Sequence, residues 1–352
     1  MTTYPWTDKI NNPAQIGGIE TAVLDNGAGR GVRVAWINTG TGLRFKVVID
    51  RGMDIADAFY NQHCLAWLNH SGITTPQPFS DRGLDWLRTF NGGLLTTCGL
   101  SHVGGPEADD YGERGIHGHI SNVPAEIESI LQPDPVTGQL TMSITGRMRE
   151  TKIFGPSLEL KRTISATLGD PTIRIHDEVV NRGNTPAPHM LLYHVNFGWP
   201  LVDEGTKLIW QGDWQPREGG INAAIFRADN DFKTCPAPLE SHLGTGEAVV
   251  FIDAKPDASG WCTAGLHNAQ LGLAVAMRFQ KAQLPWLTNW QHWGKGEYVT
   301  GIEPGTHPPI GQAKARENNT LILMQPGETR QYDLELSVLS NAGQIDDFVT
   351  SR

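Results

Sequence analysis

The 352-residue chain is predicted to form a single all-β domain, and two observations carry this prediction. Short runs in which apolar and polar residues alternate recur along the chain, and turn residues, among them 40 glycines and 22 prolines, separate these runs. No linker, low-complexity segment or repeat of fixed period divides the chain. We therefore expect one domain over residues 1–352, with its core at about residues 16–342 and with few, short helices.

Antiparallel hairpins are predicted over residues 16–60, where IETAVLD, VRVAWI and LRFKVVID are separated by NGAGRG and NTGTG. Asp50, Arg51 and Asp54 follow at the end of the third run. Charged side chains at such a place need partners when they are buried. They therefore form either an internal ion pair or a clamp for a sugar or an anion, and the sequence leaves both interpretations open.

A short peripheral helix is predicted over SDRGLDWLRTF, residues 80–90. Ser80 or Asp81 would cap it, Leu84 and Leu87 would form its apolar face, and the following Asn-Gly-Gly would end it.

Two histidines lie close together in IHGHISNVPA, where only Gly118 separates His117 from His119. Side chains two residues apart in an extended segment point the same way, so both imidazoles are expected to face one cleft. The glycine between them would let a ligand or another backbone approach closely.

Strand-like runs over residues 125–185 lead into LLYHVNFGWP, residues 191–200. Read with a period of two, this stretch predicts a half-buried strand. One face is wholly apolar, with Leu191, Tyr193, Val195, Phe197 and Trp199, and the other carries Leu192, His194 and Asn196. The apolar face is expected in the core, so the strand presents an imidazole and an amide on its other face.

A second aromatic stretch, residues 284–306, reads LPWLTNWQHWGKGEYVTGIEPGT. Its tryptophans lie beside amide and imidazole side chains, and a strand-like run then ends in Glu303. Aromatic rings beside amides and a carboxylate suit a carbohydrate, whose faces are apolar and whose rims are hydroxyls. The same residues would also suit an ordinary β core with polar edges.

Composition argues against several classes of protein. A formal net charge of −10 disfavours nucleic-acid binding, which depends on Lys and Arg neutralising phosphates. No apolar run approaches the length of a membrane span and no signal peptide is recognisable, so we expect a cytoplasmic protein. The four cysteines form no CxxC pair, which fits neither a disulfide framework nor a thiolate zinc site.

Three motifs resemble those of the aldose 1-epimerase (galactose mutarotase) superfamily. His194 within LLYHVNFGWP is similar to its histidine motif, Glu303 within YVTGIEPGT to its Glu-Pro motif, and His117-Gly118 to its upstream His-Gly element. The blocks DRGMDI, GGLLTTCGL, HGHISNVPA, LLYHVNFGWP and GIEPGT together resemble the uncharacterised DUF4432 branch, in the same order and over nearly the whole chain.

The resemblance implies a β supersandwich of mostly antiparallel sheets, with the site in an open groove. It also implies that sugar anomers are interconverted without a metal or organic cofactor. Glu303 would remove the proton of the hemiacetal hydroxyl, while protonated His194 would donate to the ring oxygen. A small-molecule sugar or sugar derivative is the expected partner. The predicted substrate-binding residues are Arg51, His117, His119, Asn196, Trp290 and Gln291.

The chain departs from the classical pattern at two points. Tyr193 stands where classical mutarotases usually have asparagine before the histidine, and Asn196 could supply an amide from the same face. No clear counterpart of the classical aspartate that binds sugar hydroxyls is found, and Asp213 is named as a candidate.

Two alternatives stay open. The first is a metal-dependent sugar isomerase or epimerase, in which His117, His119, His194 and Glu303 bind Zn²⁺, Mn²⁺ or Fe²⁺. The second is a non-catalytic carbohydrate-binding protein that uses Trp286, Trp290 and Trp293. Neither the sugar nor the oligomeric state is indicated by the sequence.

Overall fold

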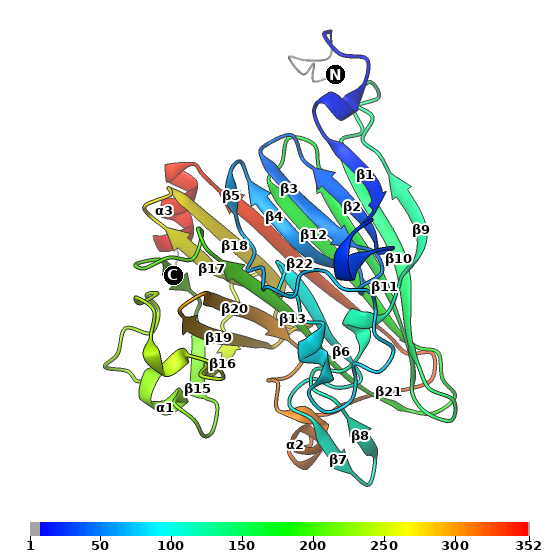
Figure 1. The fold of residues 1–352 in the computed structure, drawn as a ribbon, viewed down its shortest axis with the longest axis vertical. Helices are drawn as coiled ribbons and strands as arrows, with labels where there is room; N and C mark the ends of the chain where they lie inside the picture. The colour runs from blue at the N-terminus through cyan, green and yellow to red at the C-terminus, as the bar shows by residue number, and fades with distance from the viewer. Residues whose placement is uncertain (1–7, 351–352) are drawn as a thin grey trace.

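Two packed β-sheets form the body of the fold, and the few helices lie at their periphery (Figure 1). The computed structural model describes residues 8–350, so residues 1–7 and 351–352 of the predicted domain lie outside the described residues. The prediction of an all-β fold with short helices is confirmed. None of the helices formed by residues 8–350 is long and apolar enough to span a membrane.

The larger sheet has 12 strands in the described part of the chain, ordered β1-β2-β3-β4-β6-β13-β20-β19-β16-β15, with β5 beside β4 and β21 beside β13. Its strands are β1 (Gly18–Val23), β2 (Arg33–Asn38), β3 (Leu43–Val48), β4 (Asp54–Tyr60), β5 (His63–Cys64), β6 (Leu95–Leu100), β13 (Ala187–Gly198), β15 (Gly212–Pro216), β16 (Ala248–Ala254), β19 (Trp286–Gly294), β20 (Glu297–Gly305) and β21 (Ile322–Met324). The predicted hairpins of residues 16–60 are β1 to β4, joined antiparallel.

The second sheet has eight strands among residues 8–350, ordered β14-β17-β18-β22-β12-β11-β10-β9. They are β9 (Glu126–Leu131), β10 (Thr141–Thr151), β11 (Ser157–Thr167), β12 (Thr172–Asn181), β14 (Lys207–Ile209), β17 (Trp261–Asn268), β18 (Leu273–Gln280) and β22 (Thr329–Leu339). A separate hairpin pairs β7 (Glu107–Asp109) with β8 (Gly112–Arg114).

Helical segments are short throughout residues 8–350. The α-helices are α1 (Asn222–Ile225), α2 (Gly311–Glu317) and α3 (Ala342–Thr350). The 3₁₀ turns are η1 (Pro13–Gln15), η2 (Gly27–Gly29), η3 (Asp85–Arg88), η4 (Ile120–Asn122) and η5 (Glu240–His242).

The predicted alternation of residues 191–200 is confirmed over β13. Its apolar side chains join the main core cluster between the two sheets: Leu191, Tyr193, Val195 and Phe197. His194 and Asn196 lie on the opposite face of the same strand. The prediction was wrong on two points. Trp199 follows the last residue of the strand and is 67% exposed, and the strand is buried on both faces rather than half-buried.

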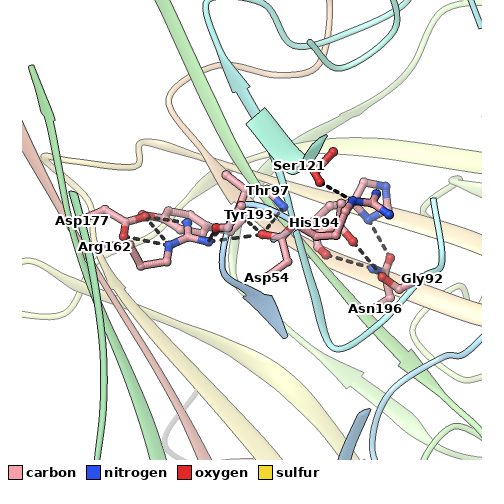
Figure 2. A network of polar contacts seen from close by, with 12 residues as sticks. Asp54, Gly92, Thr97, Ser121, Arg162, Asp177, Tyr193, His194 and Asn196 are labelled. Atoms are coloured by element: carbon pink, nitrogen blue, oxygen red, sulfur yellow. Dashed lines mark hydrogen bonds and ion pairs between the residues drawn. The ribbon is translucent and has the colours of Figure 1, made fainter. Parts of the chain in front are cut away.

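A buried polar network links β13 to the second sheet (Figure 2). The Tyr193 hydroxyl donates to Asp177 on β12 over 2.7 Å, and the Arg162 guanidinium on β11 donates to the same carboxylate. Arg162 also donates to Asp54 on β4 and to the Thr97 hydroxyl on β6. Because Asp54 and Asp177 neutralise a fully buried guanidinium, the two sheets are joined by charge as well as by apolar packing.

The charged cluster at the end of β3 is structural in this fold. Asp50 pairs with Arg33, and Asp54 pairs with Arg162. Arg51 is 4% exposed and donates to the carbonyl oxygens of Ser121, Thr74 and Thr89 and to the Thr74 hydroxyl. The guanidinium therefore holds together the loops on this side of the sheet, and its hydrogen-bond donors are used within the protein.

The helix predicted over residues 80–90 is reduced to the 3₁₀ turn η3. Gly83 adopts a φ of +47°, outside the right-handed helical region, so a continuous helix from Ser80 is not formed. The apolar face also differs from the prediction. Leu84 and Leu87 are exposed, while Trp86 and Phe90 are buried.

Candidate functional site

The register of β13 and β20 brings the two predicted catalytic residues together. Leu192 pairs with Gly305 and Asn196 with Gly301, so His194, midway between them, lies opposite Glu303. Nδ1 of His194 is 3.3 Å from Oε1 of Glu303, and their side chains are only 8% and 3% exposed. His194 and Glu303, which are 109 positions apart in the sequence, therefore contact each other across neighbouring strands.

The side chain of Asn196 contacts His194 and is not exposed. Its Oδ1 atom lies 2.6 Å from Nδ1 of His194, and its Nδ2 atom donates to the carbonyl oxygens of Gly93 and His194 (Figure 2). Asn196 is fully buried, so this predicted substrate-binding residue lies behind His194.

Aromatic rings surround the His194 imidazole on the face away from the core. The ring centroids of Phe90, Trp290, His117 and Trp86 lie 5.2, 5.4, 5.9 and 6.3 Å from that of His194. Trp67 completes this group through contacts with Phe90 and Trp290. The site is consequently more enclosed than the open groove that the resemblance implied, because the segment carrying Trp67, Trp86 and Phe90 covers it.

His117 and His119 do not share one cleft. His117 has a φ of +59° and Gly118 a φ of +74°, so the segment lacks the alternation of an extended strand. His117 packs against Trp86 and His194. His119 instead contacts the Ser80 hydroxyl over 2.9 Å through Nδ1, and it lines a cavity of about 1700 Å³ whose lining includes neither His194 nor Glu303.

The aromatic stretch divides between the two faces of β19. Trp290 lies near His194, whereas the neighbouring Gln291 donates to the Phe232 carbonyl and to Asn289 and is 1% exposed. Trp293 is buried in the main core cluster. The structure therefore brings Trp290 to the site and leaves Gln291 and Trp293 on the core side.

Burial shifts the pKa values of both predicted catalytic residues towards their neutral forms. Desolvation lowers the pKa of His194 to about 4, while the hydrogen bond to Asn196 and the charge of Glu247 act in the opposite direction. Desolvation, followed by the charge of Glu247, raises the pKa of Glu303 well above its usual value. Both shifts favour the uncharged imidazole and carboxylic acid over the expected imidazolium and carboxylate, and the two arrangements hold the same number of protons.

Three buried polar atoms around the pair form no hydrogen bond within the described residues: Glu303 Oε1, Thr288 Oγ1 and His117 Nδ1. Thr288 pairs with Glu303 in the β19–β20 register, and His117 packs against His194. Buried polar groups are almost always paired in native proteins, so unpaired atoms around one point indicate a place for a polar ligand or water.

These features accompany a clear family relationship. The family model described as "Domain of unknown function (DUF4432)" matches residues 29–338. The chain belongs to the DUF4432 family. No curated protein matches its sequence.

Solved structures show which fold this DUF4432 protein has. A putative aldose 1-epimerase from Klebsiella pneumoniae is 24% identical, with a TM-score of 0.85 over 97% of this chain and 90% of that one. A galactose 1-epimerase from Lactobacillus acidophilus is 12% identical, with a TM-score of 0.59 over 91% and 98%. A galactose mutarotase-like protein from Clostridium acetobutylicum is 12% identical, with a TM-score of 0.60 over 91% and 98%. The predicted galactose mutarotase-like fold is confirmed.

The DUF4432 site also contains charged residues that sequence reasoning missed. Glu247 accepts from Nε1 of Trp290 over 2.8 Å and pairs with Arg217 over 2.7 Å. It directly precedes β16 and is about one-third exposed. Asp213, the candidate named from sequence, is exposed on the edge strand β15. Only the register of β16 against β19 could have indicated Glu247, because no motif marks it.

The residues suggested as metal ligands do not form a metal site in the described chain. No group of three or more His, Cys, Asp or Glu side chains among residues 8–350 could hold a metal ion. The set proposed from sequence does not converge, since His119 contacts Ser80 while His117 and His194 contact each other.

Proposed function

We propose that this DUF4432 protein is an aldose 1-epimerase that interconverts the anomers of a sugar through the acid–base chemistry of its own side chains. The observation that carries the proposal is the facing pair of His194 and Glu303, enclosed by aromatic rings and bordered by unpaired polar atoms. Ring opening needs one group to accept the proton of the anomeric hydroxyl and another to deliver a proton to the ring oxygen. Two adjacent groups that share one transferable proton meet this need.

The enclosure supports the same chemistry. Each positioned acid or base typically contributes about 10²- to 10⁴-fold to a rate. Apolar surroundings strengthen such contacts and keep water from competing for the proton. Trp290 offers an aromatic face for the CH groups of a sugar ring, while Thr288 and His117 offer polar atoms for its hydroxyls.

An uncharged sugar is the substrate class that fits the charges around this pair. The charge acting on both His194 and Glu303 is that of the Glu247 carboxylate, and the guanidinium of Arg217 is already paired with it. Arg51, the cation expected to hold a hydroxyl or an acidic substituent of the substrate, is buried against backbone carbonyls. An anionic sugar would meet a carboxylate without a free cation, whereas Glu247 can accept hydrogen bonds from sugar hydroxyls.

The alternatives have less support. A metal-dependent isomerase would need His119 beside the other ligands, and a purely sugar-binding protein that uses three tryptophans would need Trp286 and Trp293 beside Trp290. Neither arrangement is present in the described residues.

Anomer exchange measured by NMR on a panel of aldoses, ketoses and uronic acids tests the proposal. We expect accelerated exchange for at least one uncharged sugar, and its loss in Glu303→Gln. Exchange that stays at the uncatalysed rate for every sugar of the panel would contradict the proposed activity.

A further inference from the structure

The contacts of Asn196 determine which nitrogen of His194 carries a proton. Nδ2 of Asn196 lies 3.2 Å from the Gly93 carbonyl oxygen and 2.9 Å from the His194 carbonyl oxygen. Carbonyl oxygens only accept hydrogen bonds, so both positions require the NH₂ end of the amide. The Oδ1 end must therefore face Nδ1 of His194, 2.6 Å away.

This orientation fixes the histidine tautomer. An amide oxygen is only an acceptor, so Nδ1 of His194 must be the donor in that contact. A neutral imidazole has one N–H group, and its other nitrogen then carries a lone pair. No hydrogen bond to Nε2 of His194 is formed within residues 8–350, so this atom is left for a substrate.

The chemical nature of the partner matters as much as its position. A carboxylate at this place would stabilise an imidazolium, as a buried aspartate does behind a catalytic histidine, whereas a neutral amide orients the ring without adding charge. The titratable groups that face His194 from neighbouring elements are Glu303 on β20, His117 in the loop before η4, and Glu247 before β16. Burial outweighs the single carboxylate charge acting on the ring, so the neutral form is favoured.

We infer that Asn196 is a positioning residue that holds His194 as the Nδ1–H imidazole, so that Nε2 accepts the proton of the anomeric hydroxyl and Glu303 supplies the proton to the ring oxygen. This inference rests on the proposed function and reverses the roles expected from the resemblance. The anomeric O–H proton moves to Nε2, a C1=O1 double bond forms, and the bond from C1 to the ring oxygen breaks. Its electron pair stays on the ring oxygen, which takes the proton of Glu303.

The reaction then returns the pair to its starting state. Ring opening leaves an imidazolium and a carboxylate that face each other across β13 and β20, so their attraction offsets the charge separation. After rotation about the bond from C1 to C2, the carbonyl is attacked from its other face and both protons move back. Asn196 touches no reacting atom in this scheme and acts only through His194.

NMR of the protein with ¹⁵N-labelled histidine tests the proton placement without any sugar. The His194 signals are identified by their absence in His194→Gln. We expect a protonated Nδ1 and an unprotonated Nε2 at pH 7, and a titration midpoint below the ordinary histidine value of about 6.5. In Asn196→Asp, which keeps the size and adds a charge, the midpoint should rise by at least one unit.

A second measurement addresses Glu303 directly. The infrared difference between wild type and Glu303→Gln at pH 7 should contain the C=O stretch of a protonated carboxyl group. A His194 that is protonated on Nε2 or on both nitrogens at pH 7, or a Glu303 that is ionised, would overturn the inference even if Asn196→Asp fails to fold. The predicted tautomer without turnover of any sugar would refute the proposed function and leave the proton placement standing.

Discussion

Nδ1 of His194 lies 3.3 Å from Oε1 of Glu303 across two neighbouring strands in the middle of the 12-stranded sheet. Their separation is set by strand register rather than by the conformation of a loop, which makes the pair rigid. In the proposed reaction these two groups carry out both proton transfers, so the loss of either group should disable both halves of the reaction.

Glu303→Gln and His194→Gln should each lower kcat for anomer exchange by about 10²- to 10⁴-fold, because each removes one positioned proton-transfer group. The double variant should be little slower than either single one, since groups that act as a unit are not additive. The same substitution at His176, a half-exposed residue on β12, is the control and should leave the rate unchanged. The rate of anomer exchange is measured by NMR. An unchanged rate in either site variant would refute the proposed proton-transfer roles of His194 and Glu303.

Glu247→Gln should raise KM more than it lowers kcat, because the proposed role of Glu247 is to hold sugar hydroxyls rather than to move protons. A loss of about 10-fold corresponds to about 1.4 kcal/mol, close to the lower end of the range for one hydrogen bond to a charged group. The variant should also lower the pKa of Glu303, since the charge of Glu247 helps to raise it. The exposed Glu240 in η5 provides the matched control, and equal effects of the two variants would contradict the proposal.

Trp290→Phe and Trp286→Phe make a matched pair on one strand. Trp290 packs against His194 with the two rings steeply inclined and donates to Glu247 through Nε1, whereas no contact between Trp286 and His194 is formed in the described chain. We expect weaker sugar binding, measured by calorimetry or as an increase in KM, only for Trp290→Phe. A larger effect of Trp286→Phe would place the sugar elsewhere.

His189 should make stability pH-dependent below neutrality. It is fully buried between the Leu100 carbonyl and the Tyr332 hydroxyl, and burial lowers its pKa from about 6.5 to about 3. The unfolded chain therefore binds a proton more readily than the folded one. The contribution of this histidine is complete above pH 6.5 and is lost as the pH falls towards 3. Urea unfolding of His189→Gln should show a shallower dependence on pH in this window than wild type, and an identical slope would refute the assignment.

Arg162→Met should destabilise the fold by about 3 to 5 kcal/mol, because Asp54 and Asp177 would lose the cation that neutralises them. Tyr193→Phe removes a single hydrogen bond to Asp177 and should cost about 1 to 3 kcal/mol. Arg174→Met breaks only partly exposed ion pairs on the same sheet and should cost less than about 1 kcal/mol. Urea unfolding measures all three variants, and a different order of costs would contradict this account of the network.

The alternation of apolar and polar side chains was enough to predict the all-β fold and the face of β13 on which His194 lies. The period of two in residues 191–200 assigned Tyr193 to the core and His194 to the other face, as the structure has them. The same rule separates Trp290 from Gln291, which are adjacent on a strand and so point to opposite faces. Gln291 could therefore have been excluded as a substrate-binding residue from the sequence.

Strand register and loop conformation could not be predicted. Glu247 reaches the site because β16 lies beside β19, a pairing that connects distant segments and leaves no local pattern. His117 and His119 diverge because His117 adopts a left-handed conformation, which residues other than glycine seldom do. Trp86 covers the site from a turn whose interruption at Gly83 makes Leu84 and Leu87 the exposed residues.

The hydroxyl of Tyr193 donates a hydrogen bond to the Asp177 carboxylate of the opposite sheet. The next residue in the chain is His194, the proposed catalytic histidine. The position of the imidazole therefore depends on β11 and β12, which belong to the other sheet. A random-mutagenesis screen for loss of turnover should consequently recover replacements of Arg162 and Asp177 alongside those in the pocket. A design that grafts the pocket onto another supersandwich would therefore also have to include the contacts of Tyr193 with Asp177 and Arg162.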